Sequence, residues 1–323
     1  MQSQDTLDIQ LGNDCIVLRG NSQESAGCVL RGHMTMTLKR DARINCIMVS
    51  FNGNAFINAD KFYRDTFFTY QQKYLELPEG EFHKFQKGIY KYDFEIALNG
   101  NMPESVRARR GSVSYLLGGL IKRQGMRSTI RVEKCIQVER TLSPTSFEWE
   151  QPVHRTGELL NQCQFYVFLP TTSYTFGDII PFNIDMIPLR AGVRMKKVHL
   201  RLMEATKYRT ALKIWSKTHV HRVSRLNCTW TMGIKASQLL ELKIPTDSQL
   251  IDVDSSTDYV RLKHYLSIRL DLVDSFGDCQ YLMLRVPVRI FSEHLKGIDD
   301  SLPTYDNAVL HPPKYEEFRS LPF

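Results

Sequence analysis

Residues 261–272 read Arg-Leu-Lys-His-Tyr-Leu-Ser-Ile-Arg-Leu-Asp-Leu, so every second side chain from Leu262 to Leu272 can face a core while those between face water. A period of two is the repeat of a β-strand, and one buried face with one wet face is typical of antiparallel sheets. The same alternation recurs at 90–98, 130–138, 197–202 and 284–290. Pairs such as Asn-Gly, Gly-Asn and Gly-Asp separate these stretches at short intervals. The sequence therefore predicts an all-β protein built from immunoglobulin-like sandwiches.

Three stretches depart from this alternation. Residues 43–51 are largely apolar on both faces, which predicts a central strand. Residues 61–77 are rich in aromatic side chains without helical spacing, and we interpret them as a long loop with one short helix. Residues 237–243 are predicted to form one or two helical turns.

Breaks in the strand pattern divide the chain. Two prolines and a polar composition mark residues 142–158, and strand patterns stop after about residue 295. We expect a first sandwich at 1–142, a linker at 143–158, a second sandwich at 159–295 and a flexible C-terminal tail at 296–323.

The composition indicates a soluble globular protein. The chain has 323 residues, 42% hydrophobic and 24% charged, which suffices for two well-filled cores. No apolar run approaches the ~18 residues of a membrane span, and neither a secretory signal nor an N-myristoylation glycine is expected. The seven scattered cysteines predict reduced thiols in the cytoplasm. The net charge of +7 suits work near anionic membranes or acidic peptides, although many proteins with neutral partners are as basic.

Patterns typical of catalysis and metal binding are weak. Residues 111–115 do not complete the Gly-x-Ser-x-Gly pattern of serine hydrolases, and no nucleotide-binding loop occurs. His219 and His221 are predicted on one strand face without further ligands at metal-binding spacing. Residues 252–258 begin like a calcium loop but lack its glycine and final glutamate, which predicts a polar turn. We expect no enzyme activity, no catalytic residue, no cofactor, no metal site and no nucleic-acid partner.

The tail contains a peptide-recognition motif, Pro312-Pro313-Lys314-Tyr315. Adjacent prolines hold the backbone near the polyproline II conformation, so the segment loses little entropy on docking. A WW domain clamps the prolines between aromatic rings and takes the tyrosine into a second pocket. We predict that Pro312, Pro313 and Tyr315 bind a WW domain.

A looser relative of this motif lies upstream, at Leu302, Pro303 and Tyr305. It is predicted to add binding through effective concentration when two WW domains bind in tandem. The alternative is a disordered tail with incidental prolines.

Basic residues crowd the start of the second sandwich. We expect Lys197, His199 and Arg201 to share a wet strand face. Two interpretations remain open: a patch for acidic cargo tails or anionic lipid, and a solvated strand face balanced by neighbouring acids. The candidate residues are Arg190, Arg194, Lys196, Lys197, Arg201, Lys207 and Arg209.

Several motifs resemble those of arrestins. In the first half they are Val17-Leu-Arg-Gly20, Val49-Ser-Phe-Asn-Gly53, the stretch 92–103 that ends Asn-Gly-Asn-Met-Pro, and Gly111-Ser-Val-Ser-Tyr-Leu-Leu117. In the second half they are the stretch 174–188, Leu202-Met-Glu-Ala-Thr-Lys-Tyr208 and Leu284-Arg-Val-Pro-Val-Arg-Ile290. With the Pro-Pro-x-Tyr tail, the chain resembles the α-arrestins, the arrestin-related trafficking adaptors, and a fungal member in particular.

The resemblance implies a non-enzymatic adaptor. Its tail would recruit a HECT-type ubiquitin ligase through WW domains, and its arrestin fold would engage the cytosolic tail of a plasma-membrane transporter or receptor. The cargo would then be ubiquitinated and endocytosed. The implied location is cytoplasmic, peripheral at the plasma membrane and endosomes. Two alternatives remain: a cargo-sorting or signalling scaffold independent of the ligase, and a structural or enzymatic protein on an arrestin-like frame.

Overall fold

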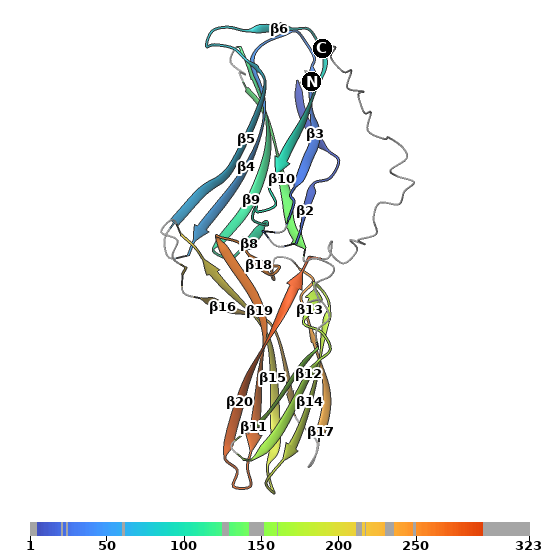
Figure 1. Ribbon diagram of the computed structural model, residues 1–323, viewed down its shortest axis with the longest axis vertical. Helices are drawn as coiled ribbons and strands as arrows, with labels where there is room; N and C mark the ends of the chain where they lie inside the picture. The colour runs from blue at the N-terminus through green and yellow to red at the C-terminus, as the bar shows by residue number, and fades with distance from the viewer. Residues whose placement is uncertain are drawn as a thin grey trace, which may run out of the picture.

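The computed structural model of the chain describes residues 5–20, 22–23, 25–59, 62–124, 129–141, 152–159, 161–210, 215–216, 218–229, 236–247 and 250–292. They form two β-sandwiches stacked end to end along the long axis of the molecule (Figure 1). Each sandwich pairs a smaller sheet with a larger one. The all-β prediction and the two-sandwich prediction are confirmed.

The first sandwich contains strands β1 to β10. Its smaller sheet has the order β1 (Thr6–Leu11), β3 (Cys28–Leu38), β7 (Gly88–Leu98). Its larger sheet has the order β2 (Cys15–Arg19), β10 (Thr129–Thr141), β9 (Gly111–Arg123), β4 (Ala42–Asn58), β5 (Phe62–Glu76), with β6 (His83–Phe85) on β4 and β8 (Val106–Ala108) on β9.

The second sandwich contains strands β11 to β20. Its smaller sheet has the order β11 (Val153–Leu159), β12 (Cys163–Leu169), β14 (Ile179–Pro188), β17 (Ala236–Lys243). Its larger sheet has the order β13 (Ser173–Thr175), β20 (Cys279–Phe291), β19 (Val260–Val273), β15 (Arg194–Tyr208), β16 (His219–Thr229), with β18 (Ser255–Ser256) on β19.

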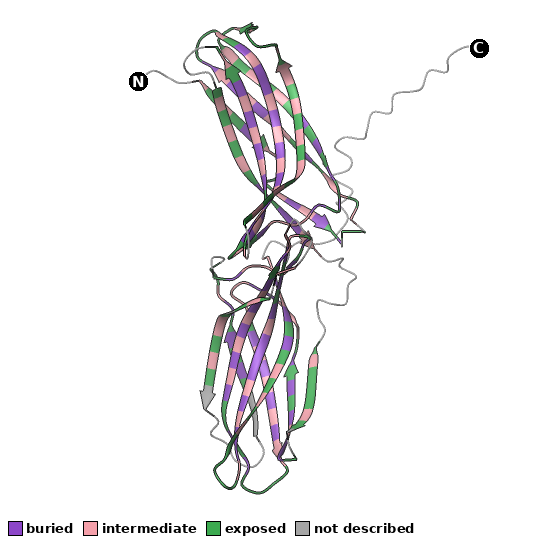
Figure 2. Ribbon diagram, turned by 90° about the vertical axis from the view of Figure 1, so that its left-hand side faces the viewer, coloured by how far each residue is buried: buried purple, intermediate pink, exposed green. Residues whose placement is uncertain are grey.

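Alternating burial builds the two cores. Figure 2 shows buried and more exposed positions following one another along most strands. In β19 the predicted apolar face is buried, and Leu262, Leu266 and Ile268 are each 0% exposed. Phe51 in the first core and Phe182 in the second are each 0% exposed. Burying one such side chain contributes about 1.5–3 kcal/mol, which explains why the strand faces are fixed so firmly.

The prediction of a loop with a short helix at 61–77 is wrong, because these residues form β5 at the edge of the larger sheet. Two register shifts in the pairing of β5 with β4 leave Phe67 and Tyr74 without a cross-strand partner on β4 and break the alternation of this edge strand. Most of its aromatic side chains are only half-buried, while Phe62 is 67% exposed. Tyr70 and Tyr74 reach across the sandwich, and their hydroxyls donate hydrogen bonds to the backbone carbonyls of Glu95 and Asp93 in β7. The aromatic residues therefore close this side of the sandwich.

Two other expectations differ from the structure. The stretch 237–243, predicted as helical turns, lies in β17, where eight cross-strand pairs with β14 outweigh its local helical preference. The range predicted as a linker ends within β11, which starts at Val153 and pairs with β12. Within the described residues, no helix is long and apolar enough to cross a membrane.

Candidate functional site

The outer face of the larger sheet in the second sandwich is lined by cations. Cross-strand pairing places Arg201 of β15 opposite Arg225 of β16 and opposite Ser267 of β19. Ser267 in turn lies opposite Arg285 of β20, so one row across four strands carries three arginines. We define the basic face as the outward-facing Lys197, Arg201, Lys207, Arg222, Arg225, Arg261, Lys263, Arg269 and Arg285.

Carboxylates are scarce on these strands. β15, β16, β19 and β20 contain two, of which Glu204 is 1% exposed and Asp271 lies on the basic face. Asp271 accepts hydrogen bonds from Arg269 Nε at 2.7 Å and contacts His199 Nε2 at 3.0 Å. Burial on its own raises the pKa of Asp271, but the contacts with Arg269 and His199 outweigh it and lower the pKa. A single ionised carboxylate leaves the basic face strongly positive at neutral pH.

Aromatic rings support some of the cations. The Arg285 guanidinium lies 5.5 Å from the centre of the Tyr265 ring, and that of Arg269 lies 4.5 Å from the Tyr281 ring. Cation–π contacts of this kind hold the guanidinium groups in position at the sheet surface. Met283 and Tyr281 are themselves 49% and 59% exposed on the same strand. The basic face can therefore bind a peptide with both acidic and apolar side chains.

The predicted basic residues divide into three groups. Lys197, Arg201 and Lys207 lie on the basic face, as expected for alternate residues of β15. Arg194 and Lys196 are exposed where β15 begins, and Arg190 is exposed on the turn from β14 to β15 at the far end of the sandwich.

Arg209 lies apart from the basic face. Its guanidinium binds Asp258 at 3.2 Å and sits 5.8 Å from the Trp215 ring, near the junction between the sandwiches. The other six residues of the basic face, which the sequence analysis did not single out, come from β16, β19 and β20. Alternation in the sequence shows that these residues face solvent, but it does not show which strands lie beside β15.

Aromatic side chains join the two sandwiches. Tyr208 at the end of β15 and Val260 at the start of β19 belong to the hydrophobic core of the first sandwich. The Tyr208 hydroxyl accepts the Arg110 backbone N–H at 3.1 Å. The Tyr259 hydroxyl donates to Asp65 at 2.8 Å. The second sandwich is thus inserted into the first through the ends of two adjacent strands.

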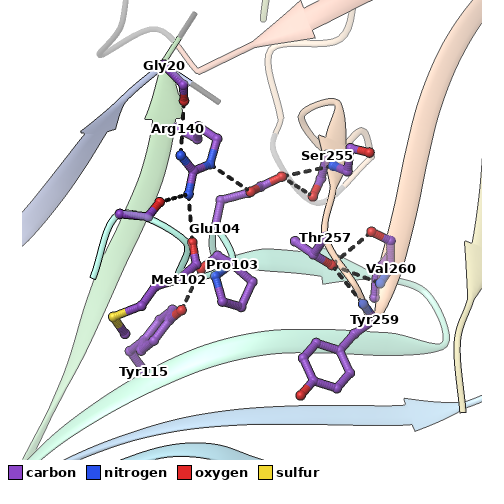
Figure 3. Close-up of polar contacts among 12 residues, drawn as sticks. Gly20, Met102, Pro103, Glu104, Tyr115, Arg140, Ser255, Thr257, Tyr259 and Val260 are labelled. Carbon is purple, nitrogen blue, oxygen red and sulfur yellow. Dashed lines mark hydrogen bonds and ion pairs between the residues drawn. The ribbon is translucent and has the colours of Figure 1, made fainter. Parts of the chain in front are cut away.

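Glu104 forms a polar bridge at the same junction (Figure 3). Its Oε1 accepts hydrogen bonds from the Ser255 hydroxyl at 2.7 Å and the Ser256 backbone N–H at 2.9 Å. Its Oε2 lies 3.6 Å from Nε of Arg140, whose two terminal nitrogens donate to the backbone carbonyls of Gly20, Gly100 and Met102. Beside this bridge a cavity of about 580 Å³ opens between the sandwiches, and Lys263 of the basic face lines it.

The predicted WW-binding residues lie outside the described residues. This applies to Pro312, Pro313 and Tyr315 and to Leu302, Pro303 and Tyr305. Their role stays a prediction. Within the described part of the chain, no group of three or more His, Cys, Asp or Glu side chains could hold a metal ion.

Comparison with known families agrees with this architecture. The arrestin (or S-antigen) N-terminal domain matches residues 21–144, and the arrestin C-terminal domain matches residues 161–295. The chain belongs to the arrestin family. The first sandwich is its arrestin N-domain and the second its arrestin C-domain, so the junction around Tyr208 and Glu104 joins the two arrestin domains.

Several fungal proteins are similar to this arrestin. The probable HECT-type ubiquitin ligase-interacting protein creD of Aspergillus terreus is 24% identical over 91% of this chain and 56% of its own length. The HECT-type ubiquitin ligase-interacting protein creD of Emericella nidulans is 24% identical over 93% of the chain and 55% of its own length. The arrestin domain-containing protein C31A2.12 of Schizosaccharomyces pombe is 22% identical over 92% of the chain and 55% of its own length. These relatives are consistent with the predicted α-arrestin subfamily, and the chain spans about half the length of the curated relatives it matches.

Proposed function

We propose that this arrestin is a non-enzymatic adaptor that brings a HECT-type ubiquitin ligase to membrane transporters or receptors. The names of its creD relatives, which describe ligase-interacting proteins, support the ligase partner. The Pro-Pro-x-Tyr motif at residues 312–315 supplies a WW-domain ligand. In this proposal the adaptor works in the cytoplasm at the plasma membrane and endosomes, and ubiquitination leads to endocytosis of the cargo.

The basic face is the observation that carries the cargo half of the proposal. Its rows of arginine and lysine contain one ionised carboxylate, Asp271, so little of their positive charge is neutralised within the face. The face therefore attracts acidic peptide segments. Cytosolic tails of membrane proteins that are rich in Asp and Glu have the complementary charge. The alternative interpretation of a balanced strand face has less support, because acids are nearly absent from these four strands.

Charge reversal across one row of the face tests this half. We expect the triple variant Arg201→Glu, Arg225→Glu and Arg285→Glu to weaken binding of a fluorescent Asp/Glu-rich peptide by at least tenfold, measured by anisotropy. The matched control reverses the exposed N-domain residues Arg64, Lys84 and Arg131, which changes the net charge equally. Equal losses in the two triple variants would show that net charge, and not the basic face, attracts the peptide.

The ligase half is tested at the tail. Calorimetric titration of a WW domain into the full chain should show that Tyr315→Ala removes most of the binding, because the tyrosine pocket stays empty. Tyr305→Ala should cost less, through the loss of effective concentration. Peptide binding without any WW binding would favour the ligase-independent scaffold.

The far end of the C-domain favours an additional contact with an anionic membrane. Phe276 is 91% exposed at the tip of the turn between β19 and β20, and Leu189 is 44% exposed on the turn from β14. These turns are neighbours, since a Cβ on Gly192 would lie 2.7 Å from Ser275 Cβ, and Arg190 stands beside them. Exposed apolar side chains near the exposed cations Arg190, Arg194 and Lys196 suit an anionic lipid surface, while Asp274 and Asp278 on the Phe276 turn oppose it. Sedimentation with phosphatidylserine vesicles should fall for Phe276→Ser and not for Ser275→Ala; equal sedimentation would refute this contact.

A further inference from the structure

A histidine lies between two carboxylates inside the C-domain, close to the junction with the N-domain. The side chain of His264 on β19 is 0% exposed, with Nδ1 2.7 Å from Asp254 Oδ1 and Nε2 3.4 Å from Glu204 Oε2. Both ring nitrogens must carry a proton to serve both carboxylates. The backbone N–H of Asp252 lies 3.5 Å from Glu204 Oε2, and the charges of Glu204 and His264 act on the Asp252 carboxyl, which adds a third carboxyl group to the cluster.

The charged groups around this cluster come from several elements. β15 contributes Glu204, and Thr206 donates to its Oε1 at 3.4 Å. Val288 of β20 lies opposite His264, and the Ile290 backbone N–H donates to Asp254 at 3.0 Å. Arg289 of β20 and Arg155 of β11 line the cavity that also touches His264 and Asp254.

The segment 250–258 contributes Asp252 and Asp254, and the N-domain contributes Arg107 and Arg109, whose positive charges act on Asp252. Inside the C-domain, three carboxyl groups therefore lie near one imidazole ring, which contacts two of them directly.

The same segment continues directly into the bridge between the domains. Asp254, held by His264, is followed by Ser255 and Ser256, which both donate to Glu104 of the N-domain. Residues 250–258 therefore connect a buried ionisable cluster at one end to an interdomain contact at the other. We name residues 250–258 the latch segment.

We propose that the latch segment is a proton-dependent tie between the two arrestin domains, closed on Glu104 when the buried cluster is protonated and released when it loses protons. In the closed state Asp252 is neutral and His264 is an imidazolium. If Asp252 ionises, it repels Glu204; if His264 loses its proton, one buried carboxylate loses its partner. Both events favour release of the segment, while the aromatic contacts of Tyr208 and Tyr259 keep the domains attached.

The direction of the pH dependence follows from the pKa values. Burial, followed by the charge of Glu204, raises the pKa of Asp252 from 3.8 to about 7. Burial lowers the pKa of His264, but the hydrogen bond to Asp254 and the negative charges of Asp254 and Glu204 outweigh it and raise the pKa from 6.5 to about 9. The closed state thus binds more protons than the released state, so raising the pH destabilises it. The contribution of Asp252 is lost between about pH 4 and pH 7, and that of His264 between about pH 6.5 and pH 9.

Amide hydrogen exchange of the full chain tests this proposal at Ser256, whose N–H is bonded to Glu104 in the closed state. We compare protection factors at pH 6 and pH 8, corrected for intrinsic exchange. The variants are Asp252→Asn and the control Asp258→Asn, which removes a carboxylate with 85% side-chain exposure from the same segment. Ser255→Ala serves as a reference in which one of the two hydrogen bonds to Glu104 is lost.

Between pH 6 and pH 8 the protection factor of Ser256 should fall by about tenfold more in the wild-type chain than in Asp252→Asn. This tenfold difference is the contribution of one carboxyl group whose pKa is 3.8 in the released state and about 7 in the closed state. Asp258→Asn should match the wild type, and Ser255→Ala should have reduced protection at both pH values. The proposal is overturned if Asp252→Asn loses as much protection as the wild type, or if protection in the wild type is independent of pH.

Discussion

Truncation of Tyr208 is expected to weaken both arrestin domains at once. This residue belongs to β15 of the C-domain, yet it is 1% exposed within the N-domain core. Removing a buried aromatic ring from a core costs about 3–5 kcal/mol, so Tyr208→Ala should lower the free energy of unfolding by that amount. Tyr208→Phe loses only the hydroxyl that accepts the Arg110 N–H at 3.1 Å and should cost about 1 kcal/mol.

Urea unfolding combined with amide hydrogen exchange separates this prediction from simple core damage. Tyr208→Ala should lower protection in β9 of the N-domain as well as in β15. The matched control is Phe182→Ala, which truncates a side chain of 0% exposure that belongs to the C-domain core alone. Its loss of protection should start in the C-domain. If Tyr208→Ala affects only the C-domain, or costs less than about 1 kcal/mol, the two domains do not share a core at Tyr208.

Three further predictions concern the junction, a turn and the basic face. Arg140→Lys should lower the free energy of unfolding in urea by about 2–3 kcal/mol, because lysine cannot reproduce the hydrogen bonds to three carbonyls together with the contact to Glu104. An unchanged midpoint of urea unfolding would contradict this. Gly100→Ala should lower the melting temperature, since the added Cβ would clash with the Ser25 carbonyl oxygen, whereas a Cβ on Gly12 would meet nothing within 4 Å and Gly12→Ala should be neutral. Equal melting temperatures would refute the close approach. Binding of an acidic peptide to the basic face should weaken as salt is raised from 50 to about 200 mM, and affinity independent of salt would argue against charge attraction.

The sequence predicted those strands that have one clean buried face. The alternation from Leu262 to Leu272 corresponds to β19, which the structure places at Val260–Val273. The prediction failed for β5, because that strand lies at a sheet edge, two register shifts interrupt its alternation, and Tyr70 and Tyr74 bond to carbonyls of β7 across the sandwich. Strand pairing across the sandwich decides such a case, and it is not a local property of the sequence.

The candidate site was predictable only in part for the same reason. Alternation correctly placed Lys197 and Arg201 on one face of β15. The basic face also needs Arg225 and Arg285, which reach it because β16, β15, β19 and β20 are neighbours in the sheet. Likewise, nothing local distinguishes Tyr208 as a residue of the opposite domain.

The adaptor account is tested most directly by asking whether one molecule of the chain joins cargo and ligase. A bead-bound Asp/Glu-rich peptide should capture a WW domain only when the full chain is added. With Tyr315→Ala the chain should stay on the beads and the WW domain should be lost, whereas the triple reversal of Arg201, Arg225 and Arg285 should lose both. Capture of the WW domain at the wild-type level by either variant would contradict the account.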